Sequence, residues 1–228
     1  LMGEPLTRPD LPRFLSMAAD RGFKSVITTN GTLLRKRADE LLNAPLHKVS
    51  ISVHSFEEGS EEAFESYLSD ITDFADRASR QGVIVALRLW NRGCDGGRNE
   101  AIMDYLRARF PEGAWQENWK GIRIRDKLHL EYGDRFTWPD KEAPEGSDQV
   151  FCYGMLDHFG ILVDGSVVPC CLDSDGAITL GNAFTEPITD ILQPPRAKAM
   201  AEGQEKIYYV TGESTDRMGK LPQVQALS

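Results

Sequence analysis

The chain alternates short β-rich segments with longer segments of helical periodicity, and this alternation limits the possible folds more than any other feature. The strand-like segments are 24–29, 47–54, 83–90 and 127–132, and the helix-like ones are 11–21, 33–42, 61–80 and 99–110. Strands separated by helices of this length predict right-handed β-α-β units and a parallel sheet. We therefore expect an α/β fold in which chemistry gathers where the strands end.

Polar residues stand at the ends of the predicted strands and suit a polar cofactor. Glu4 can accept a hydrogen bond from an ammonium group, while Asn30 and Ser52 can bond a ribose or a carboxylate. Arg88 can clasp a carboxylate with two parallel bonds, and a guanidinium in so apolar a strand requires a partner. Asn30 is followed by glycine, a pair that is also common in ordinary turns.

A hairpin is predicted in the last third of the chain. An apolar run at 159–163, an Asp-Gly pair at 164–165 and a valine pair at 167–168 favour two strands joined by a two-residue turn. Pro169 cannot donate a ladder hydrogen bond, so the second strand should end before it.

Three of the four cysteines lie around this hairpin: Cys152 before it, and Cys170 and Cys171 directly after it. Thiolates are ligands for zinc and for iron–sulfur clusters, so the three are candidate metal ligands. With His158 they would make a zinc-binding module. Free cysteines also occur as small buried apolar side chains, which is the alternative interpretation. Cys94 has no partner at metal-ligand spacing.

Composition excludes several classes of function. The 228 residues carry 35 acidic against 26 basic side chains, a net charge of −9, which argues against nucleic-acid or anionic-membrane binding. No apolar run approaches the roughly 20 residues that span a bilayer, and the N-terminus lacks a secretory pattern. Clustered cysteines fit a reduced compartment, so we expect a cytoplasmic protein.

Together these residues resemble the radical S-adenosylmethionine (SAM) enzymes that carry a C-terminal SPASM- or twitch-type domain. MGEP at 2–5 is similar to the family's Gly-Gly-Glu motif, with Met2 in place of the first glycine. TTNGTLL at 28–34, SISVHS at 50–55 and LRLWN at 87–91 resemble its next three strand ends. The hairpin segment 152–182 is similar to the opening half of the SPASM cysteine motif.

The resemblance implies a partial (β/α)6 barrel of the TIM-barrel type at 1–148, a SPASM-like hairpin plus helix at 149–200 and a tail at 201–228. It places Gly3 and Glu4 at the SAM amino group, Ser52 near the ribose and Arg88 at the carboxylate, with Asn30 a further cofactor-binding residue. Cys152, Cys170 and Cys171 would bind an auxiliary [4Fe-4S] cluster.

The implied activity is cleavage of SAM to a 5′-deoxyadenosyl radical that acts on a peptide, a protein or a small molecule. A flavodoxin or ferredoxin would supply the electron. The chain contains neither the C-x-x-x-C-x-x-C loop of the SAM-binding cluster nor a later C-x-x-C. We therefore expect an N-terminally truncated protein that is inactive alone. Besides the zinc module, a catalytically inactive peptide-binding or scaffold protein is the alternative.

Overall fold

The structure is a computed structural model that describes residues 3–56, 59–135, 155 and 158–193. The chain divides into two compact units, one of residues 3–136 and one of the remaining residues. Each unit is described by itself. The domain boundary expected at residue 148 lies outside the described residues, and so does Cys152.

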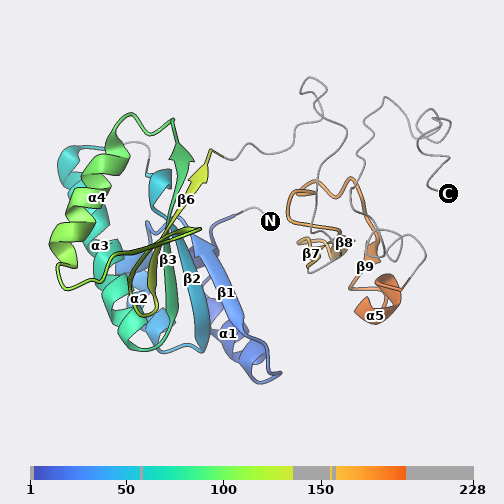
Figure 1. The fold of residues 1–228 in the computed structure, drawn as a ribbon. Helices are drawn as coiled ribbons and strands as arrows, with labels where there is room; N and C mark the ends of the chain where they lie inside the picture. The colour runs from blue at the N-terminus through green and yellow to red at the C-terminus, as the bar shows by residue number, and fades with distance from the viewer. Residues whose placement is uncertain (1–2, 57–58, 136–154, 156–157, 194–228) are drawn as a thin grey trace. The chain divides into compact units, whose positions relative to one another are not determined.

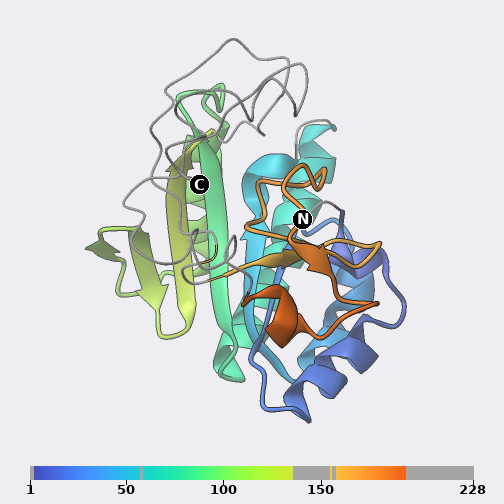
Figure 2. The same ribbon diagram turned by 90° about the vertical axis from the view of Figure 1, so that its right-hand side faces the viewer.

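The first unit is built on a six-stranded sheet in the order β1-β2-β3-β6-β5-β4. Its strands are β1 (Ser25–Thr29), β2 (Leu46–Ser52), β3 (Ile84–Arg92), β4 (Gln116–Asn118), β5 (Gly121–Arg125) and β6 (Leu128–Asp134). β1, β2, β3 and β6 pair in parallel, whereas β4 and β5 are antiparallel. The predicted α/β fold with a parallel sheet is confirmed, and Figure 2 shows its strands side by side.

Four helices gather on one face of this sheet (Figure 1): α1 (Leu11–Ala19), α2 (Leu34–Leu42), α3 (Glu61–Arg80) and α4 (Arg98–Arg109). Two short 3-10 turns, η1 (Pro5–Thr7) and η2 (Val53–Ser55), lie at strand ends. The long helix α3 has the bounds predicted for it. It begins where Ser60 Oγ accepts a hydrogen bond from Ala63 N at 3.2 Å, and its first turn is acidic, as the helix dipole favours. No helix in the described part of the chain is long and apolar enough to cross a bilayer.

Alternation along the strands sorts side chains between the two faces. The residues that β2, β3 and β6 turn toward the helices are fully buried aliphatic side chains: Val49, Ile51, Val85, Leu87, Leu89, Leu128 and Leu130. Each contributes about 1.5–3 kcal/mol through removal of apolar surface from water. The intervening residues face the other side and are mostly polar. The core thus fixes which side chains occupy the face without helices.

The antiparallel pair β4–β5 was not expected, because no strand was predicted between the helix-like segment 99–110 and the strand-like segment 127–132. The turn between the strands is closed by Asn118 Oδ1, which accepts from Lys120 N at 2.9 Å and from Gly121 N at 3.1 Å. A Cβ on Gly121 would lie 2.1 Å from Leu130 O on β6. Only glycine allows β5 to approach β6 this closely, so the pairing depends on one residue without a side chain.

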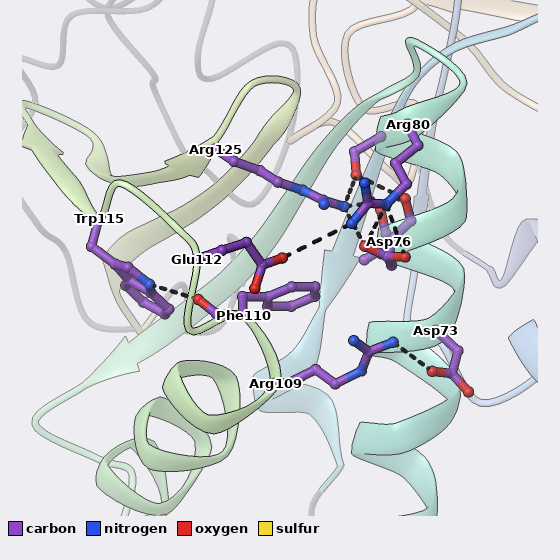
Figure 3. Close-up of polar contacts among 10 residues, drawn as sticks. Asp73, Asp76, Arg80, Arg109, Phe110, Glu112, Trp115 and Arg125 are labelled. Carbon is purple, nitrogen blue, oxygen red and sulfur yellow. Dashed lines mark hydrogen bonds and ion pairs between the residues drawn. The ribbon is translucent and has the colours of Figure 1, made fainter.

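An ion-pair network fastens β5 to α3 (Figure 3). Arg125 Nη2 on β5 donates to Asp76 Oδ1 at 2.6 Å and to Ser79 Oγ at 2.9 Å, and Arg80 Nε donates to Asp76 at 3.1 Å. Burial raises the pKa of Asp76, but the hydrogen bonds and charges of the two arginines outweigh this effect. The pKa of Asp76 is therefore lowered from its ordinary value, which keeps the carboxylate charged.

The second unit holds an antiparallel sheet of β7 (Gly160–Ile161), β8 (Ser166–Val168) and β9 (Gly181–Asn182), followed by α5 (Ile188–Ile191). The hairpin is confirmed, but the two-residue turn was wrong. Leu162 N donates to Ser166 O at 2.8 Å and Gly165 N to Leu162 O at 3.0 Å, so three residues form the loop. Gly165 has φ +87°, the left-handed position that such a loop requires after its first turn.

The ends of this unit follow the sequence in part. β8 ends at Val168, directly before Pro169, as predicted. The helix expected after the hairpin, within 149–200, is described only at Ile188–Ile191, because residues 194–228 lie outside the described part. Ile191 is buried, and a Cβ on Gly181 of β9 would lie 2.9 Å from its Cγ1. α5 therefore packs directly on the sheet of the hairpin.

Candidate functional site

Strand register lines up polar residues across the face without helices. Ser52 of β2 pairs with Arg88 of β3, and Arg88 pairs with Glu131 of β6. Thr28 of β1 pairs with Ser50, so Asn30, two residues further on, continues the line beside Ser52. We call Asn30, Ser52, Arg88 and Glu131 the polar row. It brings together three of the residues that the sequence predicted as cofactor-binding.

Glu4 is joined to one end of this row by its carboxylate. Its Oε1 accepts from Leu6 N at 3.0 Å and from Thr29 Oγ1 at 2.7 Å, and its Oε2 accepts from Asn30 N at 2.7 Å. A carboxylate offers about four acceptor positions, so the described residues leave one, on Oε2. Most of the Glu4 side chain thus holds the end of β1, and it retains a single position for an external donor.

Asn30 is held by its backbone as well as by Glu4. The hydroxyl of Tyr67 on α3 donates to Asn30 O at 2.6 Å and lies 3.5 Å from Ser52 O. Burial raises the pKa of Tyr67 by more than a hydrogen bond with Ser55 lowers it, and the charge of Glu4 adds a smaller increase. Tyr67 therefore stays protonated and donates, which ties the end of β1 to the end of β2.

The turn after Asn30 depends on glycine. Gly31 has φ +81°, and a Cβ there would lie 3.1 Å from Ile51 Cγ2 and from Ile71 Cδ1. A side chain would be strained by the backbone and would also press on the core between β2 and α3. The Asn-Gly pair is therefore both a turn and the point where the polar row meets the core.

Arg88, which lies in an apolar strand, has Glu131 as its charged partner. Its Nε lies 3.4 Å from Glu131 Oε2, and Lys48 Nζ lies 3.5 Å from Glu131 Oε1. These are ion-pair distances, yet Arg88 Nε is buried and makes no hydrogen bond to any described residue. The guanidinium also lies 4.4 Å from the centre of the Trp90 ring, a cation–π distance. Arg88 is thus positioned by charge and stacking while a donor stays unsatisfied.

His54 and Gly133 support this end of β3. His54 Nδ1 lies 3.0 Å from Arg88 O and 3.3 Å from Trp90 N, so the imidazole fastens η2 to the last residues of β3. A Cβ on Gly133 would lie 2.8 Å from Trp90 Cδ1, so the indole rests against the backbone of β6. These contacts fix the Trp90 ring over Arg88.

The cysteines of the second unit are described in part. Cys170 is buried and Cys171 is exposed, although they are neighbours in the chain. Asp173 shapes the loop after them, because its carboxylate accepts from Ala177 N at 2.7 Å and from Ile178 N at 2.8 Å. Within the described ranges no three metal-ligating side chains come together, and Cys152, the remaining candidate ligand, lies outside those ranges. His158 is exposed.

Sequence reasoning missed three residues that build the site: Lys48, Glu131 and Tyr67. A signal for Glu131 was present, because the alternation in KLHLEY at 127–132 turns His129 and Glu131 away from the buried leucines. Nothing local indicated that Glu131 would face Arg88. That depends on the register between two strands about forty residues apart in the chain.

Comparison with known proteins identifies two families in the chain. A model of the "Radical SAM superfamily" matches residues 1–113, and a SPASM model, an "iron-sulfur cluster-binding domain", matches residues 152–211. These are the two families that the sequence resembles, and the first match contains the strand ends of the polar row up to Arg88.

Individual relatives agree with this assignment. A "Probable GTP 3′,8-cyclase" of Methanococcus maripaludis is 30% identical over 168 residues, which are 72% of this chain and 55% of the relative. One of the same name from Sulfolobus acidocaldarius is 46% identical over 56 residues, 24% of this chain and 18% of the relative. An "Fe-coproporphyrin III synthase" of Methanosarcina barkeri is 33% identical over 93 residues, 38% and 22%.

The chain spans about half the length of the Methanococcus relative that it matches. The parallel sheet with helices on one face is the partial barrel that the first family implies. The chain therefore belongs to the radical SAM superfamily and carries a C-terminal SPASM-type iron–sulfur cluster-binding domain.

Proposed function

We propose that this chain forms part of an enzyme that binds SAM along the polar row and uses it to act on a small molecule. The observation that carries the proposal is the continuity of the row. Glu4 bonds Asn30 at 2.7 Å, Tyr67 links Asn30 to Ser52, and Ser52 is in register with Arg88. One line of polar groups thus joins four segments of the chain, through Glu4, Asn30, Ser52 and Arg88.

The donor and acceptor groups along this line fit SAM. The free acceptor position on Glu4 Oε2 and the backbone at Gly3 suit an ammonium group, and the unsatisfied Arg88 Nε suits a carboxylate. Asn30 and Ser52 offer further polar groups on this face, which would bond the ribose hydroxyls. SAM bound to a reduced [4Fe-4S] cluster supplies a 5′-deoxyadenosyl radical, and the residues of this chain hold and orient the cofactor.

The second unit would bind an auxiliary cluster through its cysteines. Cys152, Cys170 and Cys171 are its candidate ligands, and the match to the iron–sulfur domain supports them. The burial of Cys170 suits a thiolate shielded from solvent. Stoichiometric zinc without a brown chromophore in the anaerobically purified protein would favour the zinc module instead.

A small molecule is the proposed substrate because the relatives bear names of small-molecule enzymes, GTP 3′,8-cyclase and Fe-coproporphyrin III synthase. The electron would come from a flavodoxin- or ferredoxin-type donor. These assignments concern the enzyme as a whole, of which this chain contributes the polar row and the cysteine hairpin.

The test is SAM binding by the full gene product, reconstituted with iron and sulfide under anaerobic conditions. Arg88→Gln should weaken SAM binding about tenfold, the effect of one lost charge-assisted contact, and should lower formation of 5′-deoxyadenosine in parallel. Lys36→Gln removes a cation from the exposed side of α2 and should change neither quantity. Equal SAM affinity in the Arg88 variant and the parent would contradict the assignment.

A further inference from the structure

A second line of residues lies next to the polar row on the same face of the sheet. Ser50 of β2 pairs with Ala86 of β3, Ala86 with His129 of β6, and His129 with Arg123 of β5. We call Ser50, Ala86, His129 and Arg123 the second row. Lys48 stands two residues before Ser50 on β2 and therefore shares this face.

Ser50 is the most unusual member of the second row. Its side chain is fully buried, and its Oγ has no hydrogen-bond partner among the described residues. A buried hydroxyl without a partner destabilises the folded state, so such groups in native structures require an explanation. A ligand atom that bonds to the hydroxyl would remove this cost.

Lys48 is held only loosely. Its Nζ is 3.5 Å from Glu131 Oε1, and the same carboxylate also faces Arg88 at 3.4 Å. One carboxylate therefore serves two cations without a short hydrogen bond to either. The side chain of Lys48 keeps 27% of its surface exposed, so it is not sealed in the interior.

The balance of charge in the two rows is opposite to that of the chain. The two rows and the residues joined to them carry three cations, Lys48, Arg88 and Arg123, against two carboxylates, Glu4 and Glu131. The chain as a whole has a net charge of −9. Burial is the main cause that lowers the pKa of His129; Glu131 and Asp126 raise this pKa, and Lys48 and Arg123 lower it. Cations concentrated on one face of an acidic protein attract anions to that face.

We propose that Lys48 and Ser50 form a binding subsite for an anionic group of the substrate, a phosphate or a carboxylate. In this proposal Glu131 pairs with the Lys48 ammonium until the substrate binds. The ammonium of Lys48 supplies the charge, and the Ser50 hydroxyl supplies a hydrogen bond. This inference rests on the proposed function, because it specifies the substrate of that same face, but it assigns residues distinct from those proposed for SAM.

The experiment measures anion binding by isothermal titration calorimetry with the full gene product at fixed low ionic strength. Pyrophosphate and succinate are the probes, and they distinguish a phosphate subsite from a carboxylate subsite. Lys48→Gln should weaken binding of the preferred probe about tenfold. The control, Lys36→Gln, removes the same charge from the helix side and should have little effect.

Two further variants separate binding from structure. Ser50→Ala should weaken the probe about threefold while leaving the ligand-free protein equally or more stable, because it removes an unsatisfied hydroxyl. If the hydroxyl had a purely structural role, Ser50→Ala would instead lower the stability of the ligand-free protein. Glu131→Gln should strengthen probe binding, because it removes the competing carboxylate.

Each outcome decides the proposal. Equal weakening of probe binding by Lys36→Gln and Lys48→Gln would show a general charge effect and overturn the subsite. Failure of both pyrophosphate and succinate to bind would also overturn it. If the parent protein binds the probe but does not bind SAM, the proposed function is contradicted and the anion subsite is retained. Far-UV circular dichroism of each variant checks that it folds.

Discussion

Asp76 and Glu131 each lie between two cations in the same unit, on opposite sides of the sheet, and their surroundings differ. Asp76 receives hydrogen bonds at 2.6 and 3.1 Å from Arg125 and Arg80, and Arg125 finds a further acceptor in Ser79 (Figure 3). Glu131 meets Arg88 and Lys48 only at 3.4 and 3.5 Å. The hydrogen-bonded network around Asp76 stabilises the fold, whereas the longer ion pairs of Glu131 leave its cations able to bind a ligand.

The largest expected effect is that of Asp76→Asn. The substitution removes the charge that Arg125 and Arg80 share and should lower the free energy of unfolding by about 2 kcal/mol, because Arg125 is mostly buried and would lose its counter-ion. Urea unfolding of the chain measures the change. A loss no larger than that of Glu131→Gln would break the comparison between the two carboxylates.

Acid should reveal the same difference. The folded-state pKa of Asp76 is lowered, so its stabilisation is present above the ordinary aspartate pKa of about 3.9 and is lost as the pH falls through the lowered value. The gap in unfolding free energy between the parent and Asp76→Asn should therefore be constant from pH 7 to about 5 and should shrink below about 4. A gap that stays unchanged down to pH 2 would contradict this origin.

Glu131→Gln should cost less, under about 1 kcal/mol, because its ion pairs, at 3.4 and 3.5 Å, are longer than those of Asp76, although the side chains are buried to a similar degree. The same urea titration measures it. A loss of 2 kcal/mol or more would show that Glu131 is a structural group like Asp76, and the distinction between the two networks would fail.

The smallest effect should come from Asp73→Asn. Asp73 pairs with Arg109 of α4 at 3.0 Å, but the side chains keep 62% and 38% of their surfaces exposed. Such pairs contribute about 0.3 kcal/mol, and this contribution should vanish in 0.5 M salt. This variant is the matched control for Asp76→Asn, because both remove a carboxylate from α3.

The elements that the sequence predicted correctly are those with a strong local signal. Helix α3 follows from apolar residues at helical spacing between Ser60 and Gly82, and the four parallel strands follow from β-rich runs between helices. The strands β4 and β5 were missed because their pairing rests on a turn closed by Asn118 and on the close approach at Gly121, neither of which has a periodicity.

The sequence predicted some residues of the candidate site and not others. Asn30, Ser52 and Arg88 were expected at strand ends, and the structure aligns them in one row. Glu4 was expected as a ligand contact, and the structure adds that its carboxylate mainly holds the end of β1. Lys48, Ser50 and Glu131 were not singled out, since lysine, serine and glutamate within a strand usually face solvent.

The sequence by itself determined the α/β alternation, the direction of the sheet and the polar residues at its strand ends, because these depend on periodicity and side-chain chemistry within short segments. The tertiary structure decided the partners. Strand register placed Glu131 between Arg88 and Lys48, and close packing left Ser50 buried without a partner. Register arises from the joint packing of all strands and helices, so no local segment of the sequence contains it.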